Sequence, residues 1–149
     1  MGLDMYLSRK NKEGQMEEAG YWRKANAIHN YFVTNIQNGN DDQRAYRVPK
    51  RVFKDLLAKC TAILELAMAE GLRLEPDENG HYQEGFKASA KLTDLCNEQL
   101  PTQSGFFFGS TEYDDWYFHQ IDYTKRLIEG IFDAWDTDGH KSYYYSCWW

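Results

Sequence analysis

Two segments of the sequence gather the residue types that could hold an anion beside a planar group. The first, residues 20–30, reads GYWRKANAIHN and carries Arg23, Lys24 and His29. We expect it to open a helix, where free backbone N–H groups and the helix dipole attract a negative charge. Arg23 and Asn26 would share one face of that helix, because they are three residues apart. The alternative is a solvated helix start in which His29 is a structural, half-buried side chain.

The second segment, residues 100–116, contains the run QSGFFFGST ahead of an expected helix. Such a loop offers backbone N–H groups and hydroxyls to a phosphate or carboxylate, and aromatic rings that can stack on a base. It is not a phosphate loop of the GxxxxGK[ST] type, and Ser104 does not stand in the GxSxG context of a hydrolase nucleophile. The alternative is a loop, hinged at its glycines, that buries Phe106 or Phe108 beneath it.

Together the two segments predict a non-enzymatic binder of a small anionic, nucleotide-like ligand, with no catalytic residue, cofactor or metal ion. Arg23, Lys24 and the loop 103–111 would hold the anion, and nearby aromatic rings would stack on the planar group. This hypothesis requires the two segments to meet in space. The residues expected to bind the ligand are Trp22, Arg23, Lys24, Asn26, His29, Gln103, Ser104, Gly105, Phe107, Ser110, Thr111, Tyr113 and Trp116.

Two other functions compete with ligand binding. An acidic surface that includes Asp114 and Asp115, with an aromatic tail at 143–149, would suit an inhibitor of a host protein in defence or nucleic-acid processing. The alternative for the tail is a terminal strand packed on the N-terminal hairpin. An enzyme that uses His29 or His119 as acid and base has less support, because no spacing singles out either histidine.

Metal ligation has one weak signal. On a helix, Asp115 and His119 are four residues apart, a spacing that can supply two metal ligands. Two ligands do not make a site, and acidic residues in a first helical turn are already explained by capping and the helix dipole. We therefore expect no metal ion at these residues.

Alternating and helical patterns predict the elements that position these segments. Leu3, Met5 and Leu7 alternate with polar residues and predict a strand, and 16–21 could return as the second strand of a hairpin. The tail is rich in strand-forming residues, and 46–48 could be a short extended piece.

Apolar residues at helical spacing predict four helices, over residues 22–36, 49–71, 88–100 and 117–135. A capping box at 111–114 is expected to begin the last of them, since a hydroxyl is followed by a carboxylate three residues later. The fold class that follows is α+β. We expect a single globular domain over residues 1–149, with about four helices and a small antiparallel sheet formed by the N-terminal hairpin and the C-terminal strand.

The composition of the 149-residue chain excludes several classes of function. With 17 Lys and Arg against 23 Asp and Glu, the formal net charge is −6, which argues against a binder of duplex nucleic acid. Aromatic residues make up 16% of the chain, too many for a disordered protein. No apolar run approaches the roughly 20 residues needed to span a bilayer, and the N-terminus is unlike a signal peptide. We therefore expect a cytoplasmic protein without membrane contact, and the sequence leaves open whether it forms a homo-oligomer.

The cysteine content agrees with a cytoplasmic setting. Cys60, Cys96 and Cys147 are odd in number and form no CxxC unit, so we expect reduced thiols. Cys60 and Cys96 fall within apolar helical patterns and are expected to be small core residues.

Three blocks of the sequence resemble a family of small phage and prophage proteins. They are the opening MGLDMYL, the run GYWRKANAIHNYF at 20–32, and LPTQSGFFFGSTEYD at 100–114. They cover under half of the chain. A phosphoglycerate kinase label that some members carry finds no support, because this chain is far too short for that two-domain enzyme and lacks its nucleotide loop. The resemblance implies a phage-type setting in the host cytoplasm, where a ligand binder could sequester a host defence signal, and it implies no particular activity.

Overall fold

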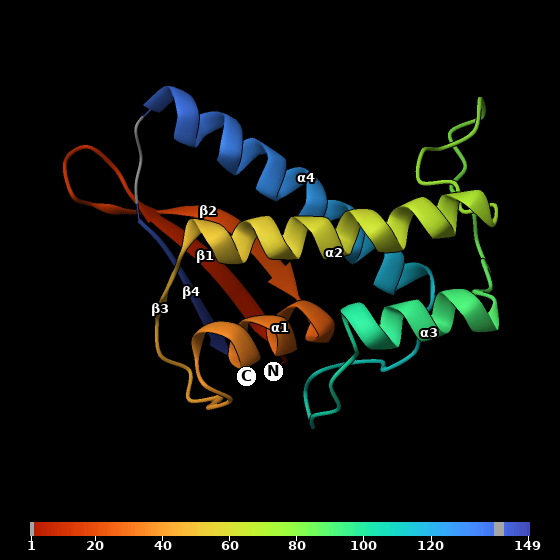
Figure 1. The fold of residues 1–149 in the computed structure, drawn as a ribbon, viewed down its shortest axis with the longest axis horizontal. Coiled ribbons are helices and arrows are strands. Elements are labelled where there is room, and N and C mark those ends of the chain that lie inside the picture. The colour runs from red at the N-terminus through yellow and green to blue at the C-terminus, as the bar shows by residue number, and fades with distance from the viewer. Residues whose placement is uncertain (1, 139–141) are drawn as a thin grey trace.

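An antiparallel sheet joins the two ends of the sequence in the computed structural model, which describes residues 2–138 and 142–149. Its strands within those residues are β1 (Asp4–Lys10), β2 (Met16–Arg23), β3 (Tyr46–Val48) and β4 (Tyr143–Trp148), in the spatial order β2-β1-β4-β3 (Figure 1). The predicted hairpin is therefore confirmed, and so is the aromatic tail as a strand packed against it. The extended piece at 46–48 adds an edge strand.

The alternation of side chains along each strand buries one face of this sheet. Met5 and Leu7 of β1 are fully buried, and their β4 partners Cys147 and Tyr145 are buried on the same face. Tyr6, between them, points to the opposite face and is half-buried. A period of two is what a sheet with one face on the core requires, so the strand predicted from Leu3, Met5 and Leu7 is confirmed.

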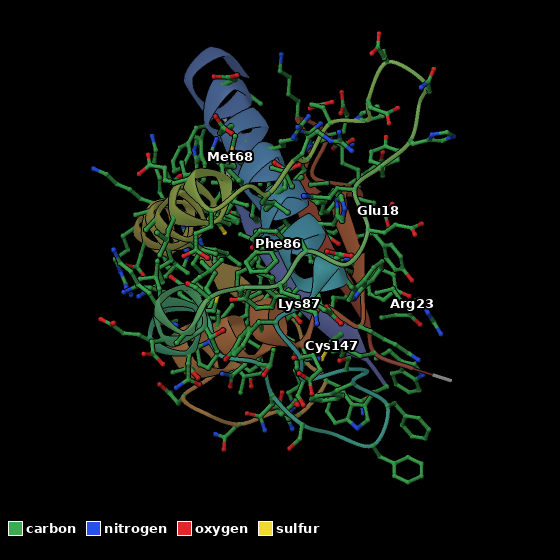
Figure 2. The ribbon with its side chains drawn as sticks, turned by 90° about the vertical axis from the view of Figure 1, so that its right-hand side faces the viewer. Glu18, Arg23, Met68, Phe86, Lys87 and Cys147 are labelled. Atoms are coloured by element: carbon green, nitrogen blue, oxygen red, sulfur yellow. The ribbon has the colours of Figure 1, made fainter. Side chains whose placement is uncertain are left out.

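Helices cover the buried face of the sheet. Within the described residues they are α1 (Asn26–Ile36), α2 (Lys50–Ala69), α3 (Ala90–Gln99) and α4 (Asp115–Asp138). Figure 2, turned by 90° from Figure 1, shows the helices gathered on one side of the strands. The indole Nε1 of Trp22 donates a hydrogen bond to Thr124 Oγ1 at 2.9 Å and so links β2 to α4. This arrangement confirms the predicted α+β class, with its helices and its antiparallel sheet.

The helix expected from Trp22 begins later, at Asn26. Trp22 pairs with Met5 near the end of β2, and its side chain is 2% exposed. Lys24 has a φ of +54°, and this turn separates the strand from the helix. Arg23 and Lys24 therefore belong to the strand end and the turn, so the expectation that they charge a helix start is wrong. The apolar spacing predicted a helix from Trp22 because Trp22, although it belongs to β2, faces the same core as the apolar residues of α1.

The capping box expected at 111–114 is also wrong. α4 begins at Asp115, and the Asp114 carboxylate accepts a hydrogen bond from the Tyr117 backbone N–H at 3.1 Å. Thr111 stays in the loop, where its carbonyl accepts a side-chain hydrogen bond. Threonine and aspartate are both favoured caps, and the sequence does not choose between them.

Two further predictions concern the cysteines and membrane-spanning helices. Cys60 and Cys96 are fully buried, as expected for small core residues. None of the helices within residues 2–138 and 142–149 combines the length and the apolar character that crossing a bilayer requires.

Candidate functional site

A cavity of about 660 Å³ opens beside α1. Its walls come from four places in the sequence: one side of α1, the segment around Asp41, the loop 103–108 and Trp149. Figure 1 shows why these can meet, since the end of the chain comes to lie next to α1. A cavity with aromatic walls and a few polar groups is the usual form of a small-molecule site.

Asn26 fastens the loop 103–110 to the start of α1. Its side chain is 3% exposed and makes three hydrogen bonds across 77 to 84 residues of sequence. Its Nδ2 donates to the carbonyls of Phe108 at 3.0 Å and Ser110 at 2.8 Å, and its Oδ1 accepts from the Gln103 backbone N–H at 3.0 Å. The two segments singled out in the sequence therefore lie against each other.

Phe108 closes the floor of the cavity. Its side chain is 7% exposed, and its ring packs edge-on against His29 at 5.2 Å and Trp149 at 6.1 Å between ring centroids. Gly105 makes room for this ring, because a Cβ at that position would lie 2.6 Å from Phe108 ring carbons. Phe106, by contrast, is 92% exposed. The alternative of a loop that buries a phenylalanine is thus confirmed for Phe108.

His29 lies at the inner end of the cavity with both ring nitrogens occupied. Its side chain is 1% exposed, Nε2 is 2.8 Å from Asp41 Oδ2, and Nδ1 is 2.6 Å from the Tyr145 hydroxyl. A carboxylate only accepts, so Nε2 donates to Asp41, and with that proton on Nε2 the Tyr145 hydroxyl can donate to Nδ1. Burial raises the pKa of Tyr145 well above its ordinary value, which keeps that hydroxyl protonated.

Cys147 completes a cluster of three donor groups. Its Sγ lies 3.8 Å from Asp41 Oδ1, and one donor atom each from His29, Asp41 and Cys147 lie within 4.8 Å of one another. Figure 2 shows Cys147 in the interior, between the sheet and the aromatic loop. Burial, reinforced by the Asp41 carboxylate, raises the pKa of this thiol to about 12.

We expect the three thiols to react slowly with iodoacetamide in the folded protein at about pH 8. Burial raises the pKa of Cys96 to about 11 and that of Cys147 to about 12, and it raises the pKa of Cys60 as well, so the reactive thiolate is scarce. Mass spectrometry of peptides after timed alkylation gives a rate for each cysteine, and denatured protein supplies the reference rates. A native rate for Cys147 equal to its denatured rate would contradict its burial.

The cavity takes in part of the predicted ligand set. His29, Gln103, Ser104, Gly105 and Phe107 line it. Asn26 lies behind it and fastens the loop.

The other predicted residues lie elsewhere. Lys24, Ser110 and Trp116 line, with Asn26, a separate hollow of about 20 Å³, which is too small for a nucleotide-sized ligand. Thr111 and Tyr113 line neither space.

Trp22 and Arg23 are already engaged with other parts of the protein. Trp22 is a core residue bonded to α4. Arg23 Nη1 donates to Asp4 Oδ1 at 2.9 Å, and the Tyr21 hydroxyl donates to the same carboxylate. These two partners hold the pKa of Asp4 below its ordinary value, with the Tyr21 hydrogen bond the larger cause. Figure 2 shows Arg23 at the outer margin of the molecule, pointing away from Cys147.

Sequence reasoning missed several residues of the site. Asp41 was not among the residues expected to bind the ligand, and Tyr145, Cys147 and Trp149 were considered only within the tail 143–149 or, for Cys147, as a reduced thiol. No local spacing could have found them, because the His29–Tyr145 contact spans 116 residues of sequence. The sequence feature that did point to the site was His29, a polar residue at an apolar position of a predicted helix.

The acidic residues considered for other functions already have partners in the structure. Asp115 accepts hydrogen bonds from the backbone N–H groups of Gly85 at 2.7 Å and Phe86 at 3.0 Å. His119 packs edge-on against the Tyr82 ring at 6.2 Å. Asp115 is thus explained by loop anchoring, as Asp114 is by helix capping.

Comparison of the chain with family models, curated proteins and solved structures finds no match.

Proposed function

We propose that this protein is a non-enzymatic binder of a small nucleotide-like ligand, whose planar group enters the cavity beside α1. The observation that carries the proposal is the set of three hydrogen bonds by which Asn26 ties the aromatic loop to α1. These bonds hold α1 and the aromatic loop on opposite sides of the cavity. In the phage-type cytoplasmic setting expected from the sequence, such a binder would sequester a host defence signal.

The walls of the cavity suit a flat ring with hydrogen-bonding edges. Phe107 and Trp149 supply aromatic surfaces, and stacking on such rings contributes about 1–3 kcal/mol per base. Asn30, Thr34 and Gln103 supply amides and a hydroxyl that can pair with ring donors and acceptors. Every base has a flat face, so the stacking gives affinity and the polar groups give selectivity.

The charge of the lining disfavours a phosphate inside the cavity. Asp41 lines the cavity, and the described lining residues include no lysine or arginine. The Lys24 side chain lies beside Gly109, at the far end of the aromatic loop. We therefore assign the anion to Lys24, which lies outside the cavity lining at that end of the loop. Arg23, which pairs with Asp4, contributes less than the sequence suggested.

The hydrogen bonds of His29 favour a binding role over a catalytic one. A general acid or base must reach the proton that it transfers. Both His29 nitrogens are already engaged, by Asp41 and by Tyr145, so neither is free to face a ligand. In this arrangement His29 holds the cavity wall together.

Thermal unfolding against a panel of bases, nucleosides, linear and cyclic nucleotides and ADP-ribose derivatives tests the proposal. A ligand at about 100 times its dissociation constant should stabilise the fold by about 2.7 kcal/mol. We expect a selective shift, larger for a nucleotide than for its nucleoside. Lys24→Ala should remove that difference, while Arg23→Ala serves as the matched control and should keep it.

A flat response to the whole panel would contradict ligand binding and favour the second candidate, an inhibitor of a host protein. Exposed aromatic side chains support that candidate, because Phe106 is 92% and Trp148 is 67% exposed. Aromatic residues are favoured anchors at protein interfaces. Substituting Trp148 and Phe106 with alanine should then abolish capture of one host protein from a lysate without lowering stability.

A further inference from the structure

The donor cluster beneath the cavity has the composition of a transition-metal site. It combines an imidazole nitrogen, a carboxylate and a sulfur from three separate elements: α1, the segment before β3, and β4. The cluster is held within the fold, with His29 at 1% and Cys147 at 4% exposed. Mixed nitrogen, oxygen and sulfur donors are typical of zinc, whereas magnesium and calcium take oxygen ligands.

From this arrangement we propose that His29, Asp41 and Cys147 bind a zinc ion at the inner end of the cavity. The proposal does not depend on the ligand assigned above. A tetrahedral zinc ion, with ligand bonds of about 2.0–2.3 Å, needs donor atoms about 3.3–3.6 Å apart. His29 Nε2 lies 2.8 Å from Asp41 Oδ2, and Cys147 Sγ lies 3.8 Å from Oδ1, the other oxygen of the same carboxylate. One donor atom from each of the three residues lies within 4.8 Å of the other two. Changes of up to about 1.2 Å in these separations, shared between the two side chains of each pair, would meet the requirement.

Tyr145 supplies the outer support that a metal-bound histidine usually has. When Nε2 of His29 ligates zinc, Nδ1 must carry the ring proton and donate it to a neighbour. The Tyr145 hydroxyl stands 2.6 Å from that nitrogen and can accept the bond. The ring of Tyr145 is itself held by stacking on Phe32, with 4.3 Å between centroids. The imidazole is therefore already oriented for a metal at Nε2.

Three protein ligands leave a fourth position for water or a bound molecule. His29 and Asp41 line the cavity, so that position faces the space in which a ligand would sit. Zinc binding displaces the Cys147 thiol proton and the Nε2 proton moves to Nδ1, with the released proton passing to solvent. The charges of zinc, one carboxylate and one thiolate then sum to zero. The metal would cancel the negative charge that Asp41 brings to the cavity.

The experiment uses the full chain, treated with a chelator and then titrated with Zn²⁺ alone against a chromophoric competitor. We expect about one ion per chain. Co²⁺ provides a second readout, because thiolate ligation gives a near-ultraviolet charge-transfer band and tetrahedral geometry gives visible d–d bands. Zn²⁺ should also raise the unfolding temperature.

Variants of two of the ligands and of Tyr145 separate a metal site from a hydrogen-bonded cluster. Cys147→Ser should abolish the charge-transfer band, and Asp41→Asn should weaken zinc binding while the far-ultraviolet circular dichroism stays unchanged. Cys96→Ser, at another buried cysteine, is the matched control and should keep the band. Tyr145→Phe should retain the band but weaken zinc binding by about 10–100-fold, as loss of an outer hydrogen bond does.

Two results would overturn the proposal. One is a wild-type protein that binds Zn²⁺ no more tightly than Asp41→Asn while both are folded. The other is a Co²⁺ spectrum that Cys147→Ser leaves unchanged, which would place the metal elsewhere on the chain. Either result would leave the three residues as a hydrogen-bonded cluster and would not affect the nucleotide panel.

Discussion

Replacing Asn26 with alanine is expected to lower the free energy of unfolding by about 2–4 kcal/mol. The substitution removes one side chain and leaves the carbonyls of Phe108 and Ser110 and the N–H of Gln103 without their partner. A buried polar group that loses its partner costs about 1–3 kcal/mol, and water can reach some of these groups once the loop loosens. The loop should therefore detach from α1 before the whole fold is lost.

Urea unfolding followed by circular dichroism measures the loss, and limited proteolysis at 103–110 measures the loosening of the loop. Asn35→Ala is the matched control, since the Asn35 amide donates a hydrogen bond within its own helix, to the Tyr31 carbonyl at 2.8 Å. That control should change stability by under about 0.5 kcal/mol. Equal stability of the two variants would show that the Asn26 bonds do not hold the loop. Ligand-induced stabilisation should also fall in Asn26→Ala.

The elements of the fold were largely predictable because local periodicity encodes them. β1 reads as a strand from Leu3, Met5 and Leu7, and α2 reads as a helix from its apolar stripe. The boundaries were less predictable, because a residue near a boundary can fit the apolar pattern of either neighbouring element. Trp22 fits a helical stripe and a strand equally well, and pairing with Met5 decides for the strand.

The site was predictable only in its two most distinctive pieces. The residues around His29 and the aromatic loop could be singled out from composition, yet their contact depends on Asn26 reaching partners about 80 residues away. The cations were misassigned for a related reason. Arg23 looks free in the sequence, but the pairing of β1 with β2 places Asp4 directly opposite it. Charge partners across a sheet follow from register, which a local pattern does not carry.

Two phenylalanines of the same loop, two residues apart, are expected to differ sharply in how much stability is lost when each is replaced with alanine. Phe108→Ala should lower the free energy of unfolding by about 3 kcal/mol, since truncating a buried phenylalanine commonly costs about 3–5 kcal/mol. Its ring, 7% exposed, supports His29 and Trp149 at once, so both should lose their fixed positions. Phe106→Ala should leave stability within about 0.5 kcal/mol, because that ring is 92% exposed.

Denaturant unfolding and ligand titration of both variants measure this contrast. Phe106 borders the cavity and packs edge-on against Phe107, at 4.7 Å between centroids, so its loss should weaken the binding of a stacked ligand with no loss of stability. The expected effect is at most about 1–3 kcal/mol in binding free energy, the range for removal of one stacking ring. Unchanged ligand affinity in Phe106→Ala would exclude this ring as a stacking surface. A stable Phe108→Ala would instead mean that the loop does not depend on its buried ring and that its hydrogen bonds to Asn26 and to the Leu3 backbone N–H hold it in place.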